Sequence, residues 1–409
     1  MHIDSIGPSS STTPPARTPS AAPLRLPARL GQLLCLDDFE AAARRHLPPP
    51  VFAYISGGVE RSESLQANRA AFADYAFIPR VMVDITKRTT AVTLLGSRYA
   101  APFGLAPMGL CSLSGYNGDV VLARSAAAEN IPMVMSGASL MRMEEVVAAN
   151  PDAWFQAYLP ADEASIVALV ERVKAAGFRT LVITADTPVS GNRENMVRAG
   201  FSTPLRPSLG LAWHGITHPR WLFGNFLRTL AERGMPHFES AYAHRGAPIL
   251  SQTAVREMGD RGHLNWDYFR TVRRIWPGPI ILKGVLDARD ARQAVDHGAD
   301  GIIVSNHGGR QLDGAVAPMR VLPQVVAACP EVPVMIDSGI RRGSDVLKAL
   351  ALGARFVFVG RPFNYAASVA GEAGVRHAIA LLQQEVSRNM ALLGVNALSE
   401  LDRSFLSEH

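Results

Sequence analysis

Short apolar runs recur along the chain from residue 102 onward and alternate with Ala-rich segments of helical pattern. Ala-rich stretches such as 161–177 and 287–299 separate the runs. Strands that alternate with helices in this way pair in parallel. Eight such units predict a closed (β/α)8 (TIM) barrel, an α/β fold. The eight runs occupy residues 102–107, 131–136, 153–158, 180–186, 279–283, 301–306, 333–337 and 355–360.

The segment that precedes the first strand divides into two parts. Residues 1–34 are rich in Ser, Pro and Ala without a period, which predicts a disordered tail. Their arginines also resemble an organellar transit peptide weakly, although the prolines disfavour an amphipathic helix. Residues 35–409 are expected to form one domain. In it, 36–47 predicts a helix, and two glycines end 51–58 in a turn that exposes Tyr54.

One connection, between the fourth and fifth strands, is much longer than the others. It runs over 190–265 and carries aromatic residues and histidines among prolines and glycines. A connection of this length is usually a functional lid or an inserted binding segment, and an ordinary surface excursion fits the same pattern. The aromatic residues and basic neighbours in 205–250 also fit a patch that lies in a membrane interface.

Composition narrows the class of protein. The chain has 409 residues, of which 48% are hydrophobic, but no uninterrupted apolar run of the length that spans a bilayer. Cys35, Cys111 and Cys329 are scattered, which favours a reducing, cytoplasmic location over a disulfide framework or a metal site. The net charge of +5 is compatible with acidic substrates or an anionic membrane surface. We expect no nucleic-acid partner.

Each predicted strand ends in polar or glycine-bearing residues. In this barrel the catalytic groups lie at the carboxyl ends of the strands. Any one of these residues can instead cap the following helix, but eight at the same ring of positions indicate a site. In chain order they are Pro107-Met108-Gly109, Ser136, Gln156 with Tyr158, Thr184 with Asp186, Lys283, Ser305-Asn306-His307, Asp337-Ser338-Gly339 and Gly360-Arg361.

The segment SNHGGRQLD carries the candidates for proton transfer and carboxylate binding. His307 stands between an apolar strand and two glycines, and its ordinary pKa suits it to accept a proton near neutrality. Arg310 can grip a carboxylate through two hydrogen bonds. The alternative is that His307 caps a helix and Arg310 pairs with Asp313. Asp186 can hold His307 in one tautomer, and Arg193 is either a second substrate cation or a surface residue of the insert.

A second cluster of residues indicates phosphate. Gly339 and Gly343 let a phosphate approach the backbone, and Arg341 and Arg361 supply charge, where the seventh and eighth strands end and this fold commonly binds phosphate. Lys283, across the barrel mouth, either lies beneath a ring that becomes anionic on reduction or is a solvated lysine. The set favours a phosphorylated cofactor over a bare substrate.

These segments together resemble the FMN-dependent α-hydroxy acid dehydrogenase family, which includes glycolate oxidase, lactate monooxygenase and mandelate dehydrogenase. WFQAY, SNHGGRQLDG and DSGIRRGSDV carry the resemblance, which extends over nearly all of residues 36 to 401. It implies an FMN cofactor, oxidation of an L-2-hydroxy acid (L-lactate or a similar acid) to the 2-oxo acid, and a homo-oligomer, often a tetramer. The family's mechanism is written as α-proton abstraction or as hydride transfer, and both need the same base.

The resemblance also implies the role of each site residue. His307 is the base and Asp186 orients it, with Tyr158 and Arg310 beside the reacting atoms. Tyr54, Tyr158, Arg193 and Arg310 hold the substrate. The assignments of Ser136, Gln156 and Thr184 depend on the resemblance alone. The cofactor contacts are Pro107, Met108, Gly109, Ser136, Gln156, Thr184, Lys283, Ser305, Asp337, Ser338, Gly339, Ile340, Arg341, Gly360 and Arg361.

The chain departs from the family's pattern at several positions. Gly109 stands where oxidases often have alanine, and Ser338 where glycolate oxidase has glycine. Gly137 and Ala138 replace bulkier residues, which predicts a roomier substrate pocket. With the basic, aromatic 205–250 segment, these departures favour a quinone or another carrier as electron acceptor and a peripheral position on the inner face of the cell membrane. The alternatives are an oxidase that forms hydrogen peroxide and a flavin-free lyase or isomerase.

Overall fold

The computed structural model describes residues 29–202, 204–251 and 261–408. Eight parallel strands lie at its centre in the order β4-β11-β10-β9-β8-β7-β6-β5. A parallel bridge between Leu105 and Met133 joins the two ends of this order and closes the barrel. The predicted (β/α)8 fold is confirmed. The strands are β4 (Phe103–Leu105), β5 (Val134–Ser136), β6 (Trp154–Ala157), β7 (Leu181–Thr184), β8 (Ile280–Val285), β9 (Gly301–Val304), β10 (Val334–Ile336) and β11 (Phe356–Val359).

Every strand of the barrel is buried on both faces, which explains why the sequence shows continuous apolar runs instead of an alternating pattern. Successive side chains face the barrel interior and the helices in turn. In β6, Trp154 belongs to the interior cluster, whereas Phe155 packs edge-on against Phe178 in the outer core. Leu94 and Tyr99, from the hairpin of β2 (Val92–Leu94) and β3 (Ser97–Tyr99), belong to the interior cluster as well.

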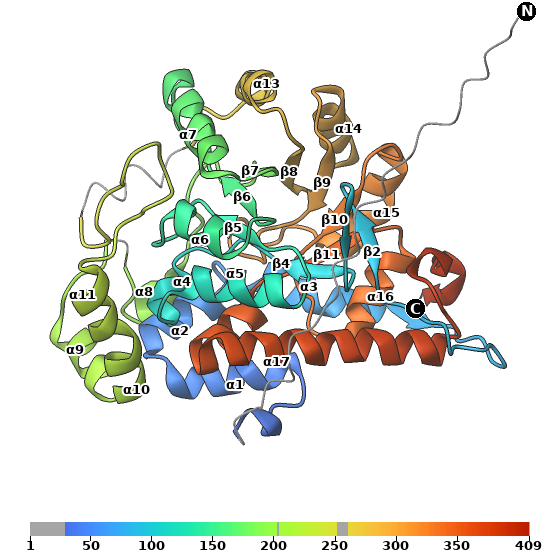
Figure 1. Ribbon diagram of the computed structural model, residues 1–409, viewed down its shortest axis with the longest axis horizontal. Helices are drawn as coiled ribbons and strands as arrows, with labels where there is room; N and C mark the ends of the chain where they lie inside the picture. The colour runs from blue at the N-terminus through green and yellow to red at the C-terminus, as the bar shows by residue number, and fades with distance from the viewer. Residues whose placement is uncertain (1–28, 203, 252–260, 409) are drawn as a thin grey trace, which may run out of the picture.

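Helices surround the barrel, and the long α17 runs alongside α1 on one side of the molecule (Figure 1). The predicted helical stretches 161–177 and 287–299 are confirmed as α7 and α14. The helices outside the insert are α1 (Leu36–His46), α2 (Pro49–Ser56), α3 (Glu63–Ala70), α4 (Cys111–Ser114), α5 (Gly118–Ala128), α6 (Met143–Ala149), α7 (Glu163–Ala176), α13 (Trp266–Ile275), α14 (Ala288–Asp296), α15 (Pro318–Ala328), α16 (Gly343–Ala351) and α17 (Arg361–Leu393).

The remaining short elements border the barrel. β1 and β12 form an antiparallel pair close to the carboxyl end of the described chain. These elements are η1 (Leu30–Gln32), η2 (Ala71–Asp74), β1 (Tyr75–Phe77), η4 (Leu398–Glu400), η5 (Arg403–Phe405) and β12 (Leu406–Glu408).

The amino-terminal region differs from the prediction at two points. Residues 1–28 of the predicted tail lie outside the described residues, but Leu30 is buried in the main core and His377 bonds the carbonyl oxygen of Leu33 at 2.9 Å. The boundary at residue 34 is therefore too late. The predicted turn that carries Tyr54 is helix α2, which begins at Pro49 and ends before Gly57, because proline suits the first turn of a helix.

The described part of the insert between β7 and β8 contains several short helices. It contains α8 (Glu194–Arg198), α9 (Leu209–Ile216), α10 (Pro219–Trp221), η3 (Leu222–Leu227) and α11 (Arg228–Arg233). The last four lie together at one side of the molecule (Figure 1). The side chains of Trp221 and Asn225 donate hydrogen bonds of 2.7 and 2.8 Å to the carbonyl oxygen of Leu113, which fix this group of helices to α4. Among the described helices, none combines the length and the apolarity required to cross a bilayer.

Candidate active site

A cavity of about 510 Å³ lies at the carboxyl ends of the strands, where the strand-end pattern predicts the site. Residues at or just after the carboxyl ends of all eight strands line it. Ser136, Asp186 and Ser305 lie behind the lining, in contact with Gln156, His307 and Lys283 respectively. The other predicted residues line it: Tyr54, Pro107, Met108, Gly109, Gln156, Tyr158, Thr184, Arg193, Lys283, His307, Arg310, Asp337, Ser338, Gly339, Ile340, Arg341, Gly360 and Arg361.

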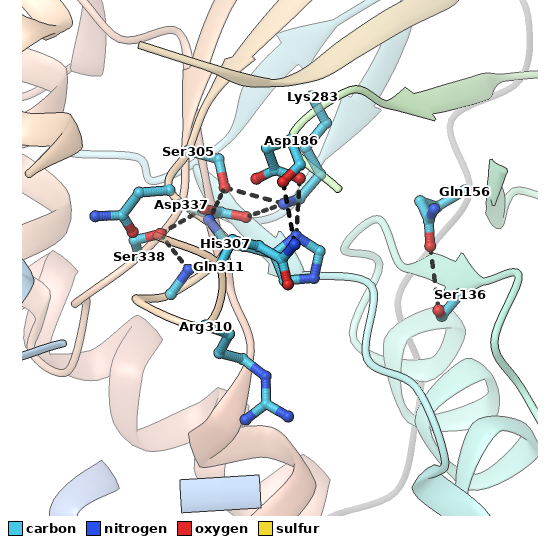
Figure 2. A network of polar contacts seen from close by, with 12 residues as sticks. Ser136, Gln156, Asp186, Lys283, Ser305, His307, Arg310, Gln311, Asp337 and Ser338 are labelled. Atoms are coloured by element: carbon cyan, nitrogen blue, oxygen red, sulfur yellow. Dashed lines mark hydrogen bonds and ion pairs between the residues drawn. The ribbon is translucent and has the colours of Figure 1, made fainter. Parts of the chain in front are cut away.

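His307 and Asp186 form a largely buried pair beside the cavity. Nδ1 of His307 lies 2.9 Å from Oδ1 of Asp186 (Figure 2). Burial lowers the pKa of His307; the charge of Asp186 opposes this shift and that of Lys283 adds to it. Burial by itself raises the pKa of Asp186, but His307 and Lys283 hold it below its ordinary value. The pair is therefore a neutral imidazole beside a carboxylate, as a base with an orienting group requires.

A β-bulge makes room for this carboxylate. The register of β8 against β9 shifts between Lys283 and Val285, and Gly284 adopts φ +100° there. A Cβ atom on Gly284 would lie 2.6 Å from Cβ of Asp186, so only glycine fits. Gly284 follows the apolar run in the sequence directly, and a glycine inside a strand pattern is the one signal that marks it.

The loop that carries His307 has an unusual backbone. His307, Gly308 and Gly309 have φ of 58°, 67° and 70°, all in the left-handed region that favours glycine. Two serine hydroxyls accept hydrogen bonds from the backbone of this loop. Ser305 Oγ accepts from the N–H of His307 at 3.0 Å, and Ser338 Oγ accepts from the N–H of Gly308 at 3.0 Å. This strained conformation directs the imidazole to the cavity, and such strain is common at active sites.

Asn68, in α3, supports the same loop. The sequence pattern did not predict it as a site residue. Asn68 and Asn306 exchange two side-chain hydrogen bonds of 2.7 Å, and Asn68 is 1% exposed. The carbonyl oxygen of Asn68 also packs so closely on Gly339 that a Cβ atom there would lie 2.1 Å away. No strand end or motif marks Asn68, because its partners are distant in the chain.

Lys283 is buried and paired, not solvated. Its ammonium lies 3.1 Å from Oδ2 of Asp337 and donates to Ser305 Oγ at 3.0 Å (Figure 2). Burial opposes the charge, but Asp337 and Asp186 raise the pKa of Lys283 above its ordinary value. The lysine therefore presents a fixed positive charge at the cavity wall.

Among the described residues, five arginines line the cavity and bring further positive charge to it. Arg310 donates to the carbonyl oxygens of Tyr54, Ile55 and Gly57 at the end of α2, and not to Asp313, which accepts from the backbone of α3 and the residues before it. The alternative Arg310–Asp313 pair is thus not formed. Burial, with repulsion from Arg193 and Arg361, lowers the pKa of Arg310 to about 9, so it stays charged at neutral pH. A buried cluster of cations favours an anionic ligand.

Two tyrosines face these cations. The guanidinium of Arg310 lies 5.1 Å from the ring centre of Tyr54, and that of Arg261 lies 4.4 Å from the ring centre of Tyr158. Burial raises the pKa of both phenols, which keeps them as neutral hydrogen-bond donors. Arg261, at the end of the insert, is a cavity residue that the sequence reasoning missed, because no motif surrounds it.

The end of the cavity next to β10 and β11 is built for an anion. Helix α17 begins at Arg361 after Gly360, and no side chain caps its amino terminus. Uncapped N–H groups and the helix dipole attract phosphate, and the buried Arg341 and the half-buried Arg361 lie beside them. Gly343 was expected here too, but it packs against α17, where a Cβ atom would lie 2.5 Å from the Val386 nitrogen. Gly343 therefore serves helix packing.

The opposite wall offers an unused hydrogen-bond donor. Ser136 Oγ donates to Oε1 of Gln156 at 3.1 Å, and Nε2 of Gln156 is buried with no hydrogen-bond partner among the described residues. Buried polar groups are almost always paired, so this amide fits a ligand with an acceptor edge. Of the two small residues after β5, Ala138 lines the cavity, whereas Gly137 is required by packing against the Gln156 carbonyl oxygen, 2.8 Å from its Cβ position.

The fold and these groups define a barrel enzyme that binds a phosphorylated cofactor beside a proton-accepting histidine. The chain belongs to the FMN-dependent dehydrogenase family, whose model matches residues 43–408. FMN is accordingly its cofactor, and the uncapped helix, the arginines and the Gln156 amide fit its phosphate and the polar edge of its ring.

Known relatives agree with this assignment. The chain is 40% identical to an L-lactate dehydrogenase of Pseudomonas entomophila (strain L48) over 374 residues, which cover 90% of this chain and 97% of that protein. Its structure is similar to the crystal structure of a monotopic membrane protein, (S)-mandelate dehydrogenase, with a TM-score of 0.85, 36% identity and coverage of 92% and 100%. A mandelate oxidase with (S)-2-phenylpropionate matches at a TM-score of 0.76 and 35% identity, covering 92% and 98%.

Proposed function

We propose that the protein oxidises an L-2-hydroxy acid to the 2-oxo acid, with FMN as the electron acceptor in the site and His307 as the base. The observation that carries this proposal is the neutral His307 paired with Asp186 at 2.9 Å in a cavity that also holds Arg310 and Arg193. Such a cavity binds a carboxylate and removes a proton from the carbon or oxygen next to it.

The substrate's carboxylate is held by the cations at the α2 side of the cavity. Arg310 is anchored by backbone carbonyls, and Arg193 is oriented by a 2.9 Å hydrogen bond to Gln311 Oε1. Their remaining N–H groups, with the neutral phenols of Tyr54 and Tyr158, supply donors to a carboxylate and a hydroxyl. Binding through these groups brings the 2-hydroxy carbon next to the imidazole, which converts proton removal into an intramolecular step.

Proton transfer is the step that the chain's own residues perform. Nδ1 of His307 is engaged by Asp186, so Nε2 is the nitrogen that accepts the proton, and Asp186 stabilises the resulting imidazolium. FMN, when bound, takes up the two electrons that leave the substrate. Lys283, kept charged by Asp337, provides a positive charge on the cofactor side. Removal of the proton from carbon or from the hydroxyl uses the same base.

We assign the cofactor contacts to the two ends of the cavity, the phosphate to one end and the ring to the other. The phosphate is assigned to the amino terminus of α17 with Arg341 and the backbone after Asp337. The polar edge of the ring is assigned to Gln156 and Thr184, with Ser136 acting through Gln156, and Pro107-Met108-Gly109 would hold the ring from the side. Nε2 of Gln156 supports this assignment, since it has no partner among the described residues.

The side of the cavity that faces the insert is apolar and favours a substrate with an apolar side chain. Leu110, Ala138, Met196, Phe201 and Phe238 line it. A Cβ atom on Gly109 would lie 3.1 Å from the Tyr54 hydroxyl, so glycine leaves extra room there. Lactate-like acids with small or aromatic side chains therefore fit, in agreement with the substrates that the relatives' names state.

A membrane contact is proposed for α9 and η3. Leu209, Trp213, Ile216 and Phe223 are exposed, with Trp213 64% and Phe223 67% accessible, and Arg220 lies exposed next to them. Apolar aromatics with a basic neighbour bind the interface of an anionic membrane, and one structural relative is described as monotopic. A membrane quinone is then the expected acceptor, and hydrogen peroxide formation with oxygen is the alternative.

Three experiments test these proposals. Anaerobic addition of L-lactate, L-mandelate and their D-enantiomers is expected to bleach the flavin absorbance with the L-acids only; no bleaching with any 2-hydroxy acid would contradict the function. Reoxidation is expected to be faster with a quinone analogue than with oxygen. For the membrane, a Trp213→Ser/Phe223→Ser double variant should sediment less with anionic vesicles, whereas Leu392→Ser, an exposed leucine (68%) on α17, should sediment like the wild type.

A further inference from the structure

Ser338 has a backbone conformation that disfavours serine. Its φ is 79°, and the next residue, Gly339, has φ 88°. A side chain in this left-handed region costs free energy that glycine avoids. The resemblance places glycine at this position in part of the family, so glycine is compatible with the fold. An outlier of this kind indicates a function for the side chain.

The hydroxyl of Ser338 joins two loops of the site. It donates to Oδ1 of Asp337 at 2.8 Å and accepts from the backbone N–H of Gly308 at 3.0 Å. Gly308 follows His307 directly and lies 30 residues before Ser338. The serine therefore connects the cofactor loop after β10 to the peptide that carries the imidazole.

The two hydrogen bonds close a ring of polar contacts (Figure 2). From Asp337 the ring continues through Oδ2 to Lys283 at 3.1 Å, and from Lys283 to Ser305 Oγ at 3.0 Å. Ser305 Oγ then accepts from the N–H of His307 at 3.0 Å. Two consecutive N–H groups, those of His307 and Gly308, are thus fixed to one buried ion pair, and loss of the Ser338 hydroxyl frees the second.

We propose that Ser338 is a positioning residue: its hydroxyl fixes the His307–Gly308 peptide relative to the Lys283–Asp337 ion pair and so aims the imidazole at the substrate. Gly308 is free to rotate without this bond because glycine tolerates a wide range of backbone angles. The inference rests on the proposed role of His307 as the base. It predicts that the strain of Ser338 is retained for reactivity and not for stability.

The test separates the hydroxyl from the backbone strain. Ser338→Ala removes the hydroxyl and keeps the strain, and Ser338→Gly removes both. Both variants are expected to bind FMN, and flavin reduction by the preferred L-acid should be about ten- to a hundredfold slower, since small displacements of a reacting group have effects of that size. The substrate KM should change little, because Arg310 and Arg193 are intact. Ser338→Gly should have a higher midpoint of thermal unfolding than Ser338→Ala.

Ser62→Gly is the matched control. Ser62 also has a positive φ, of 62°, at the start of α3, outside the polar ring. Its replacement should leave the rate of flavin reduction unchanged whatever it does to the unfolding midpoint. Wild-type reduction rates in both Ser338 variants, or loss of FMN from Ser338→Ala, would overturn the inference. A wild type that no 2-hydroxy acid reduces would instead contradict the proposed function.

Discussion

Oδ1 of Asp186 lies 2.9 Å from Nδ1 of His307, although the two residues are 121 positions apart in the chain. The contact exists because β7 and β9 flank β8, whose bulge at Gly284 leaves space for the carboxylate. Both groups are largely buried, so water does not screen their interaction strongly. The pair therefore determines the tautomer of the imidazole and the stability of its protonated form.

Replacement of the carboxylate tests this relationship. Asp186→Asn keeps the shape but loses the charge that stabilises the imidazolium, and an amide can favour the wrong tautomer. The rate of flavin reduction should fall by about 10²- to 10⁴-fold with little change in bound FMN. Stopped-flow absorbance at a saturating L-acid measures this rate. Asp313→Asn, which alters a carboxylate bonded to the backbone near α3, serves as the control.

Removal of the base is expected to stop the reaction while the cofactor stays bound. His307→Gln preserves some hydrogen bonding but has no basic nitrogen. Flavin reduction should slow by at least about 10²- to 10⁴-fold, the usual contribution of general base catalysis. The flavin content of the purified variant, from its absorbance after denaturation, shows whether FMN is retained. Reduction at the wild-type rate would exclude His307 as the base.

The pH dependence follows from the lowered pKa of His307. The base acts when neutral, and burial moves its pKa below the ordinary value of about 6.5. Hence kcat/KM should be constant near neutrality and fall about tenfold per pH unit only below that lowered pKa. In Asp186→Asn the carboxylate no longer raises the pKa of His307, so the acid limb should move to lower pH. An acid limb above pH 7 would contradict the described environment.

The geometry of Arg310 predicts that lysine is a poor substitute. Its guanidinium bonds the carbonyl oxygens of α2 while facing the cavity, which a single ammonium cannot reproduce. Arg310→Lys should raise the substrate KM by at least about tenfold, consistent with the loss of one charge-assisted hydrogen bond. Steady-state kinetics with a quinone analogue measure it. Arg320→Lys, in an exposed ion pair with Asp74, should leave KM unchanged.

The Asn68–Asn306 pair predicts a stability effect. Asn68→Ala removes two buried hydrogen bonds from the amide of Asn306, which costs about 1–3 kcal/mol of unfolding free energy. Urea unfolding followed by tryptophan fluorescence measures the change. Flavin reduction should slow as well, because Asn306 also holds the Gly309 N–H at 3.1 Å. Asn150→Ala, at another buried asparagine that only caps a local turn, should destabilise without slowing reduction.

Several features of the site could not be predicted from the sequence. Asn68 and Arg261 lie outside every motif, and Gly284 is marked only as a glycine in a strand pattern. Their contacts join segments that the chain order leaves far apart. Gly343 was assigned to phosphate because glycine in a strand-end loop suggests an anion site, yet its role is to let α17 approach. A glycine's purpose depends on which atoms surround it, and those are fixed only when the helices pack.

The apolar runs by themselves determined the number, order and parallel pairing of the strands, because a strand buried on both faces must be apolar throughout. Their polar ends likewise determined which residues meet at one rim of the barrel. Only the tertiary structure decided how those groups interact. Lys283 forms an ion pair, Arg310 donates hydrogen bonds to α2 and not to Asp313, and His307 is neutral. Distances and desolvation set these properties, and both arise from packing between segments far apart in the chain.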